Sequence, residues 1–193
     1  MNLLNCAKNI EPCQRNWDEN FVIPEEHIQY ILDVCTTVPT KQNMNVYSLV
    51  AITDRQTMFN IFKKAAYNPD DYNRTFMRNS QINANALLVW CDGTEEPEDE
   101  RDRDLAIGIS SGSAALAAAE LGYSTGFCKC FVPEKITKVL RKQNIKTNNN
   151  TYLMLGIGKP NNEYNRRIPL VNGYPQRPHV SQGKKDILIR RID

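Results

Sequence analysis

The stretch Asp104–Phe131 reads DLAIGISSGSAALAAAELGYSTGFCKCF. From Leu105 to Ala119 it carries no charge, and most of its side chains are small. This pattern is typical neither of an amphipathic surface helix nor of a strand. The run is shorter than the roughly 20 residues that a membrane-spanning helix needs, so we expect no membrane role. We interpret it as a helix against which another backbone or a flat ring can lie closely; the alternative is the central helix of an ordinary core.

Small residues recur at spacings of four along this helix, for example at Gly108 and Gly112 and at Ser111 and Ala115. Such residues share one helix face and would form a flat strip. We hypothesise that this strip lies at a dimer interface. The segment GFCKCF, residues 126–131, is predicted to be a turn whose backbone amides could point at a ligand.

Composition and charge narrow the class of protein. A chain of 193 residues with 41% hydrophobic and 24% charged residues predicts one domain with a packed core. The formal net charge of +2 gives no reason to expect nucleic-acid binding. The six cysteines include one CxC pair and fit no zinc pattern, so we expect no metal site. The N-terminus lacks the apolar core of a signal peptide, which favours a cytoplasmic, reducing location with free thiols.

The remaining segments predict helices that alternate loosely with apolar strands. No GxGxxG motif follows a strand, so a dinucleotide-binding doubly wound fold is not favoured. We expect an α+β fold of buried strands wrapped by helices. The charged residues 94–104 are predicted to form a solvated loop, and 161–193 a polar arm lying on another surface. Helices are expected from Pro24 to Pro39, from Asp54 and from Pro133, and strands over 46–54, 86–91 and 151–160.

Side-chain catalysis has little support in this sequence. Only two histidines are present, His27 and His179, and no segment resembles a nucleophile elbow. A Ser/His/Asp or Cys/His site stays open, because such sites are recognised by geometry. If the protein is an enzyme, we expect a cofactor to carry the chemistry.

Four segments, in order, resemble the FMN-dependent nitroreductase family. They are CQRNWDENFVIPEEHIQYILDVCTTVPTKQN from Cys13, RNSQINANALLVWC from Arg78, the stretch quoted first, and YLMLGIGKP ending at Pro160. The resemblance implies an α+β fold with a central, mostly antiparallel sheet wrapped by helices. It also implies an intertwined homodimer with one FMN at each of two subunit interfaces. Residues 1–193 would be a single FMN-binding domain, whose arm 161–193 packs on the partner subunit.

The same resemblance assigns cofactor-binding roles, residue by residue. Near the FMN phosphate it implies Cys13 and Arg15, with Lys184 and Lys185 closing over that phosphate. A loop that reaches the flavin bound mainly by the partner subunit corresponds to Pro39, Thr40 and Lys41. Asn43 corresponds to an Asn that hydrogen-bonds the isoalloxazine edge, and Asn79 and Gln81 correspond to polar groups near the pyrimidine side of the ring. Backbone amides that face the ring correspond to Cys128, Lys129 and Cys130.

Two positions depart from the family pattern. Glu11 and Pro12 stand where an additional phosphate-binding Arg is usual, and Lys184, Lys185 or Arg166 would have to compensate. Lys129 replaces an acidic residue or Gly, so it either brings a cation near the flavin or points to solvent. Without the resemblance, Arg15 reads as a surface ion pair, Asn43 as a turn cap and the late lysines as solubilising charges.

The resemblance implies an FMN-dependent oxidoreductase. Electrons would pass from NADH or NADPH to an electron-poor small-molecule acceptor, nitro- or quinone-like, by a ping-pong mechanism. A relative with divergent flavin use, either flavin cleavage or reductive dehalogenation, is the first alternative. A non-catalytic binding module is the second.

Overall fold

The computed structural model describes residues 2–10, 14–64, 80–145 and 150–161, and the backbone of a short hairpin of β5 (Leu170–Val171) and β6 (Tyr174–Pro175). The predicted arm 161–193 lies, apart from Asn161 and that hairpin backbone, outside the described residues. Its packing on a partner stays a prediction.

A four-stranded sheet in the order β1-β2-β4-β3 forms the centre of the molecule, and every pairing in it is antiparallel. The strands are β1 (Tyr47–Ile52), β2 (Ala86–Asp92), β3 (Ser124–Cys128) and β4 (Thr151–Gly158). In the middle of the sheet Val89 pairs with Val50 on one side and with Met154 on the other. The expected α+β class with an antiparallel sheet is confirmed.

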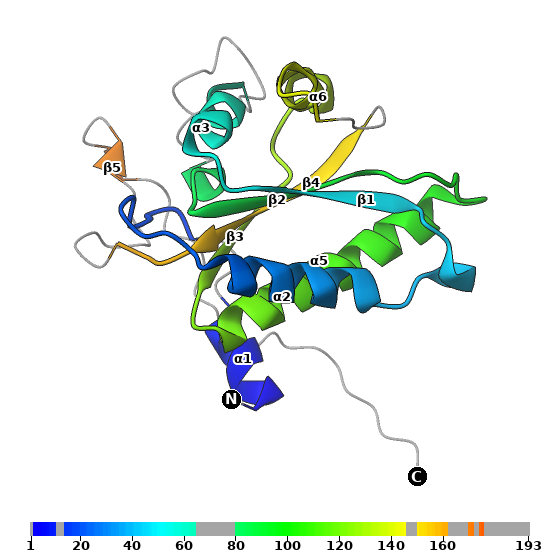
Figure 1. The fold of residues 1–193 in the computed structure, drawn as a ribbon, viewed down its shortest axis with the longest axis horizontal. Coiled ribbons are helices and arrows are strands. Elements are labelled where there is room, and N and C mark those ends of the chain that lie inside the picture. The colour runs from blue at the N-terminus through cyan, green and yellow to red at the C-terminus, as the bar shows by residue number, and fades with distance from the viewer. Residues whose placement is uncertain are drawn as a thin grey trace.

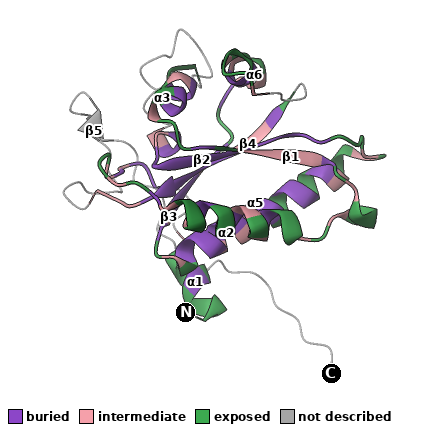
Figure 2. Ribbon diagram, in the orientation of Figure 1, coloured by how far each residue is buried: buried purple, intermediate pink, exposed green. Residues whose placement is uncertain are grey.

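Helices cover both faces of this sheet (Figure 1). One face carries α2 (Glu25–Thr37) and α5 (Glu100–Glu120), with α1 (Leu3–Asn9) beyond them; the other carries α3 (Arg55–Lys64) and α6 (Pro133–Lys142). Because side chains alternate along a strand, Leu88 and Trp90 pack toward α2 and α5, while Leu87 and Val89 pack toward α3 and α6. This explains why all of β2 is buried and reads as a continuous apolar run (Figure 2).

The helix over the opening stretch begins earlier than predicted. Asp99 is its N-cap: the carboxylate accepts a hydrogen bond of 2.9 Å from the Arg101 amide. Glu100 and Asp102 then lie where the helix N-terminus favours negative charge. The prediction of a solvated loop over 94–104 is therefore wrong for its second half, which includes the buried Arg103.

The first half of the segment predicted as a turn after α5, residues 126–128, belongs to a strand. Residues 124–128 form β3 at the edge of the sheet, and only Lys129 and the residues after it lie beyond the strand. Gly126 is required here, because a Cβ at this position would lie 2.5 Å from Gln81 Cβ. A Cβ on Gly156 would overlap the Gln81 carbonyl oxygen, so both glycines let residue 81 lie directly on the sheet.

The other predicted helices are confirmed as α2, α3 and α6. Asp54 caps α3, as expected: its carboxylate accepts a 2.7 Å hydrogen bond from the Thr57 amide. The hydrogen bonds from Thr57 hold the pKa of Asp54 below its ordinary value. Within the part of the chain that the structure describes, none of the helices combines the length and apolar character needed to cross a membrane.

Candidate functional site

Arg15 lies in an extended segment that is tied to the edge of the sheet. The Gln14 amide donates to Thr125 O in β3 at 2.9 Å, and Trp17 forms an antiparallel bridge with Pro160. The Trp17 indole also donates to Ser80 O at 3.1 Å. These contacts hold Arg15 at 9% exposure, so it is not a surface residue.

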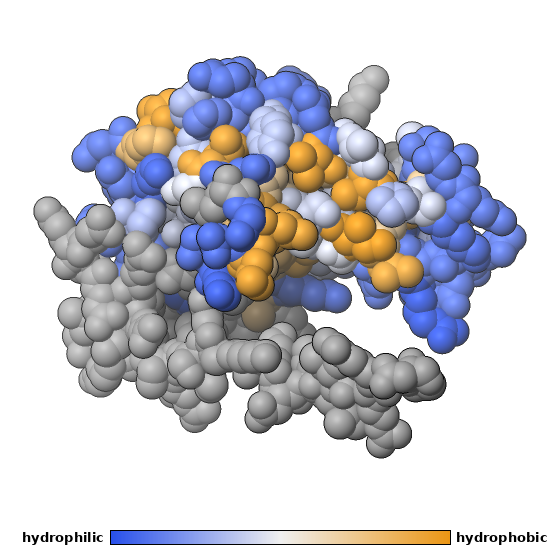
Figure 3. Space-filling view, turned by 90° about the horizontal axis from the view of Figure 1, so that it is seen from below, coloured by the Kyte–Doolittle hydropathy of each residue, from blue (hydrophilic) through white to orange (hydrophobic). Residues whose placement is uncertain are grey.

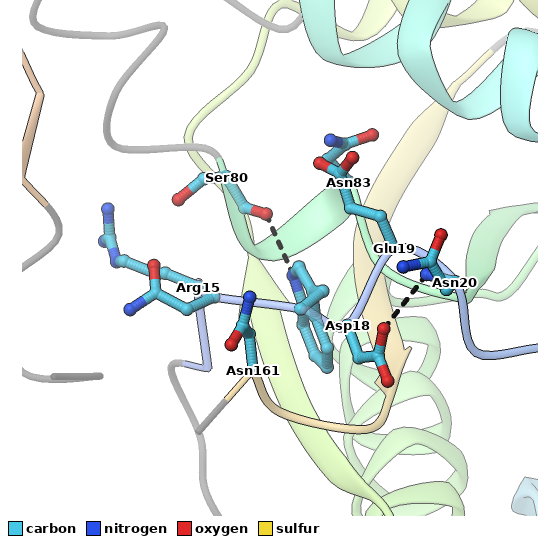
Figure 4. Close-up of a pocket in the computed structure, with 9 residues that line it drawn as sticks. Arg15, Asp18, Glu19, Asn20, Ser80, Asn83 and Asn161 are labelled. Atoms are coloured by element: carbon cyan, nitrogen blue, oxygen red, sulfur yellow. Dashed lines mark hydrogen bonds between the residues drawn. The ribbon is translucent and has the colours of Figure 1, made fainter. Parts of the chain in front are cut away.

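A polar hollow of about 520 Å³ opens beside this segment; it is lined by Arg15, Asn16, Trp17, Asp18, Glu19, Asn20, Ser80, Asn83 and Asn161. Figure 4 shows Arg15 and Ser80 together at one end of it, whereas Asp18, Glu19 and Asn83 lie at the other. The hollow thus has a cationic end and an acidic end. An anion is compatible with the Arg15 end, where a guanidinium can donate two parallel hydrogen bonds.

Gln81 packs on the sheet and follows Ser80, which lines the hollow. Its side chain is buried, and Nε2 donates to Phe127 O in β3 at 3.2 Å. Within the described residues, Gln81 Oε1 is a buried oxygen without a hydrogen-bond partner. A buried acceptor in this state is costly unless a donor arrives.

The turn that contains Pro39, Thr40 and Lys41 is exposed and tightly closed. Thr40 Oγ1 donates to Met44 O at 2.9 Å, and Asn43 is exposed within the turn. Lys41 Nζ lies 2.8 Å from Asp102 Oδ2, at the start of α5. The hydrogen bond and the charge of Asp102 raise the pKa of Lys41.

Arg15 and the turn lie at opposite ends of α5 within one chain. The turn contacts Asp102 in the first turn of the helix, whereas Gln14 contacts Thr125 just after its C-terminus. A helix of 21 residues is roughly 30 Å long. The two groups of predicted site residues therefore do not meet in a single copy (Figure 1).

The CxC segment splits between the core and the surface. Cys128 is the last residue of β3, and its side chain packs in the cluster under α3 and α6. Lys129 and Cys130 are exposed, so the interpretation that the Lys129 side chain points to solvent fits this chain. Of the three residues expected in a loop facing the flavin ring, only Lys129 and Cys130 lie outside the strand.

The remaining predicted site residues, Cys13, Asn79, Lys184 and Lys185, lie outside the described residues. Ser80, Asn83 and Asn161 line the hollow, although the sequence did not single them out. For Ser80 and Asn83 the signal was the density of Asn and Ser after the predicted Asn79, in the segment NSQINAN.

One face of α5 is open. It consists of Leu105, Gly108, Ile109, Gly112 and Leu116, and we call it the α5 open face. A Cβ added to Gly108 or Gly112 would meet nothing within 4 Å, and Leu105 is 64% exposed. Apolar side chains gather across this side of the molecule (Figure 3). Next to it, α1 and α2 border an apolar hollow of about 380 Å³, lined by Leu3, Cys6, Tyr30, Val34, Ser113, Leu116, Ala117 and Glu120.

Comparison with solved structures identifies this arrangement. A nitroreductase family protein from Clostridium novyi NT superposes with a TM-score of 0.67 at 16% identity, over 84% of this chain and 87% of that one. The chain has the nitroreductase fold. No protein-family model and no curated protein sequence matches it.

Two further neighbours with the nitroreductase fold hold FMN. A nitroreductase with bound FMN from Desulfitobacterium hafniense DCB-2 gives a TM-score of 0.64 at 16% identity, covering 94% of this chain and 95% of that one. Oxidized iodotyrosine deiodinase bound to FMN and 3-iodo-L-tyrosine gives 0.67 at 16% identity, covering 98% of each chain. The fold expected from the resemblance is confirmed, and these proteins show that it accommodates FMN.

Proposed function

We propose that the protein is an FMN-dependent oxidoreductase of the cytoplasm. It takes electrons from NADH or NADPH and passes them to an electron-poor acceptor such as a nitro compound or a quinone. The observation that carries the proposal is the separation of Arg15 and the 39–43 turn along α5. Two copies joined through the α5 open face would each supply the half of the site that the other lacks, with one FMN at each interface.

The residues present fit FMN. The guanidinium of Arg15 suits the phosphate, because it is always charged and donates in a fixed fork. The acidic end of the hollow repels the phosphate, so the phosphate is expected at the end that contains Arg15 and Ser80. The flavin ring is then expected near Gln81. Gln81 Oε1 is a hydrogen-bond acceptor without a donor among the described residues, and the flavin ring has an N–H donor on its pyrimidine side. Cys13, Asn79, Lys184 and Lys185 complete the proposed site, the lysines in place of the Arg missing at positions 11 and 12.

Bound FMN would supply the redox chemistry: a hydride accepted from NAD(P)H in one half-reaction and two electrons passed to the acceptor in the next. The protein's part is to bind, orient and exclude water. Asn43 and the turn around it are proposed to approach the flavin edge from the partner subunit. The backbone of Lys129 and Cys130 is proposed to face the ring, which leaves the Lys129 ammonium in solvent.

Reductive dehalogenation of an aromatic compound is the second candidate. Its support is the likeness to iodotyrosine deiodinase, which extends over 98% of each chain. Both candidates use the same cofactor site, so they differ only in the acceptor.

The test is a purification followed by a visible spectrum and an FMN titration of the full chain. We expect a yellow protein with one FMN per chain, bleached under anaerobic conditions by NADH or NADPH. Reoxidation by a nitro compound or a quinone supports the first candidate, and reoxidation only by a halogenated aromatic supports the second. A colourless protein that FMN does not reconstitute would contradict both and favour a non-catalytic binding module.

A further inference from the structure

The turn Pro39–Met44 is joined to the segment Gly93–Arg103 by a series of contacts. At its near end, Lys41 Nζ lies 2.8 Å from Asp102 Oδ2 and 3.8 Å from Glu98 Oε2. Just after the turn, Asn45 O accepts hydrogen bonds from the amides of residues 94 and 95. The segment predicted as a free surface loop is thus attached at Lys41 within the turn and at Asn45 just after it.

Three further hydrogen bonds complete the attachment. The Glu95 carboxylate accepts a hydrogen bond from the Asn45 amide. The buried Arg103 guanidinium donates through Nε to Val46 O at 3.2 Å and through Nη2 to Glu96 Oε2 at 2.6 Å. Val46 begins the approach to β1, so the attachment is anchored in the sheet.

The turn needs such support because of its backbone. Gln42 and Asn43 are consecutive residues with φ of 52° and 59°. The left-handed region is unfavourable for residues with a Cβ, and it persists where the surroundings hold it. Inside the turn, the Asn43 amide donates to Thr40 O at 3.2 Å and the Met44 amide to Lys41 O at 3.0 Å. Lys41 is therefore both part of the turn and its link to α5.

We propose that Gly93–Arg103 is a clamp that holds this turn in shape, and that Lys41 is the positioning residue through which the clamp acts. The clamp itself follows from the contacts above. Its consequence for the cofactor, that a fixed turn presents Asn43 to FMN, rests on the proposed function. Lys41 then acts through its ion pair with Asp102 instead of donating to the flavin.

The effect of the clamp on the turn is tested in the full chain without cofactor, by measuring the rates of amide hydrogen exchange. Lys41→Met and Asp102→Asn each remove the ion pair, and exchange of the Asn43 and Met44 amides should become roughly two- to fivefold faster, the range of an exposed ion pair. Lys41→Arg keeps the charge and should exchange like the native chain. High salt should speed exchange in the native chain but not in Lys41→Met.

Arg101→Met is the matched control. It removes a more exposed ion pair, Arg101 with the N-cap Asp99, at the same end of α5, but it does not touch the turn. We expect native exchange at Asn43 and Met44 in this variant. Native exchange in Lys41→Met, or an equal acceleration in Arg101→Met, would overturn the clamp.

The link to FMN is tested by titration with the same variants. Lys41→Met and Asp102→Asn should bind FMN roughly two- to fivefold more weakly, and Lys41→Arg and Arg101→Met should bind it like the native chain. Faster exchange with unchanged FMN affinity would overturn the positioning role. A native chain that binds no FMN would instead contradict the proposed function, and the exchange experiment would still decide the clamp.

Discussion

Trp90 Nε1 donates a 3.1 Å hydrogen bond to Ser110 Oγ, joining the central strand β2 to the middle of α5. The same hydroxyl donates to Cys35 O in α2 at 3.1 Å. This buried pair of bonds fixes the rotation of α5 on the sheet. Gly108 and Gly112, two positions to either side of Ser110, are each about 200° around the helix from it and must face outward. Gly108 and Gly112 therefore lie outside the core, as the hypothesis of an interface requires, whereas Ser111 and Ala115, the other predicted members of the strip, are buried within this chain.

Gly112→Leu should release both partner and cofactor. The added side chain meets open space in one copy, so the monomer should fold. In a close helix–helix contact it should cost about 1–3 kcal/mol by overpacking. Sedimentation should show weaker dimerisation, and absorbance should show loss of flavin. Gln29→Leu, on the exposed face of α2, is the control; a Gly112→Leu protein that stays dimeric and yellow would remove the strip from the interface.

Arg15→Ala should weaken FMN binding by about 1.5–3 kcal/mol, the range for a hydrogen bond to a charged group. Titration with riboflavin separates the phosphate from the ring. Because riboflavin has no phosphate, its affinity should change little in this variant. Equal losses for FMN and riboflavin would mean that Arg15 supports the fold of the site and not the phosphate.

Helices and central strands of this fold were predictable, because their signals are local. The stripe of Ile28, Ile31 and Cys35 predicts α2, and the apolar run of β2 follows from burial on both faces. β3 was missed because STGFC has small and polar residues; its pairing with β4, far along the chain, makes it a strand. The start of α5 was missed because it lies in a run of charged residues, which predicts a solvated loop. The N-cap Asp99 begins the helix within that run.

The candidate site was less accessible to sequence reasoning. The burial of Arg15 depends on contacts of Gln14 with Thr125 and of Trp17 with Ser80, which no local pattern contains. The role of the charged residues 94–103 was also missed. Charge density predicts solvation, but their backbone and carboxylates are bound to the turn and to Arg103.

Arg103→Met should lower the free energy of unfolding by about 3 kcal/mol. Arg103 is 5% exposed and donates to Tyr152 OH at 2.6 Å, with Asp92 Oδ1 at 3.6 Å. Removing one member of a buried ion pair leaves the other charge without compensation. Denaturant unfolding measures the loss, and Arg101→Met, on the surface of the same helix, should leave the midpoint unchanged. A native midpoint for Arg103→Met would contradict a structural role.

Tyr152 should titrate late. Burial, together with the hydrogen bond to Asp92, raises its pKa to about 12. The folded state thus holds the proton more tightly than the unfolded state, whose tyrosines titrate near pH 10. The stabilisation is complete below pH 10 and is lost as the pH rises toward 12. Ultraviolet difference titration should show a late tyrosinate that is absent in Tyr152→Phe; identical titrations would contradict this.

The most direct test of the central claim is sedimentation velocity of the native chain with FMN, followed at a flavin absorption band. The claim is that two copies meet through the α5 open face and together complete two FMN sites. We predict a single yellow species of twice the chain mass, with one FMN per chain. Flavin that sediments with a monomer, or a dimer that carries none, would contradict it.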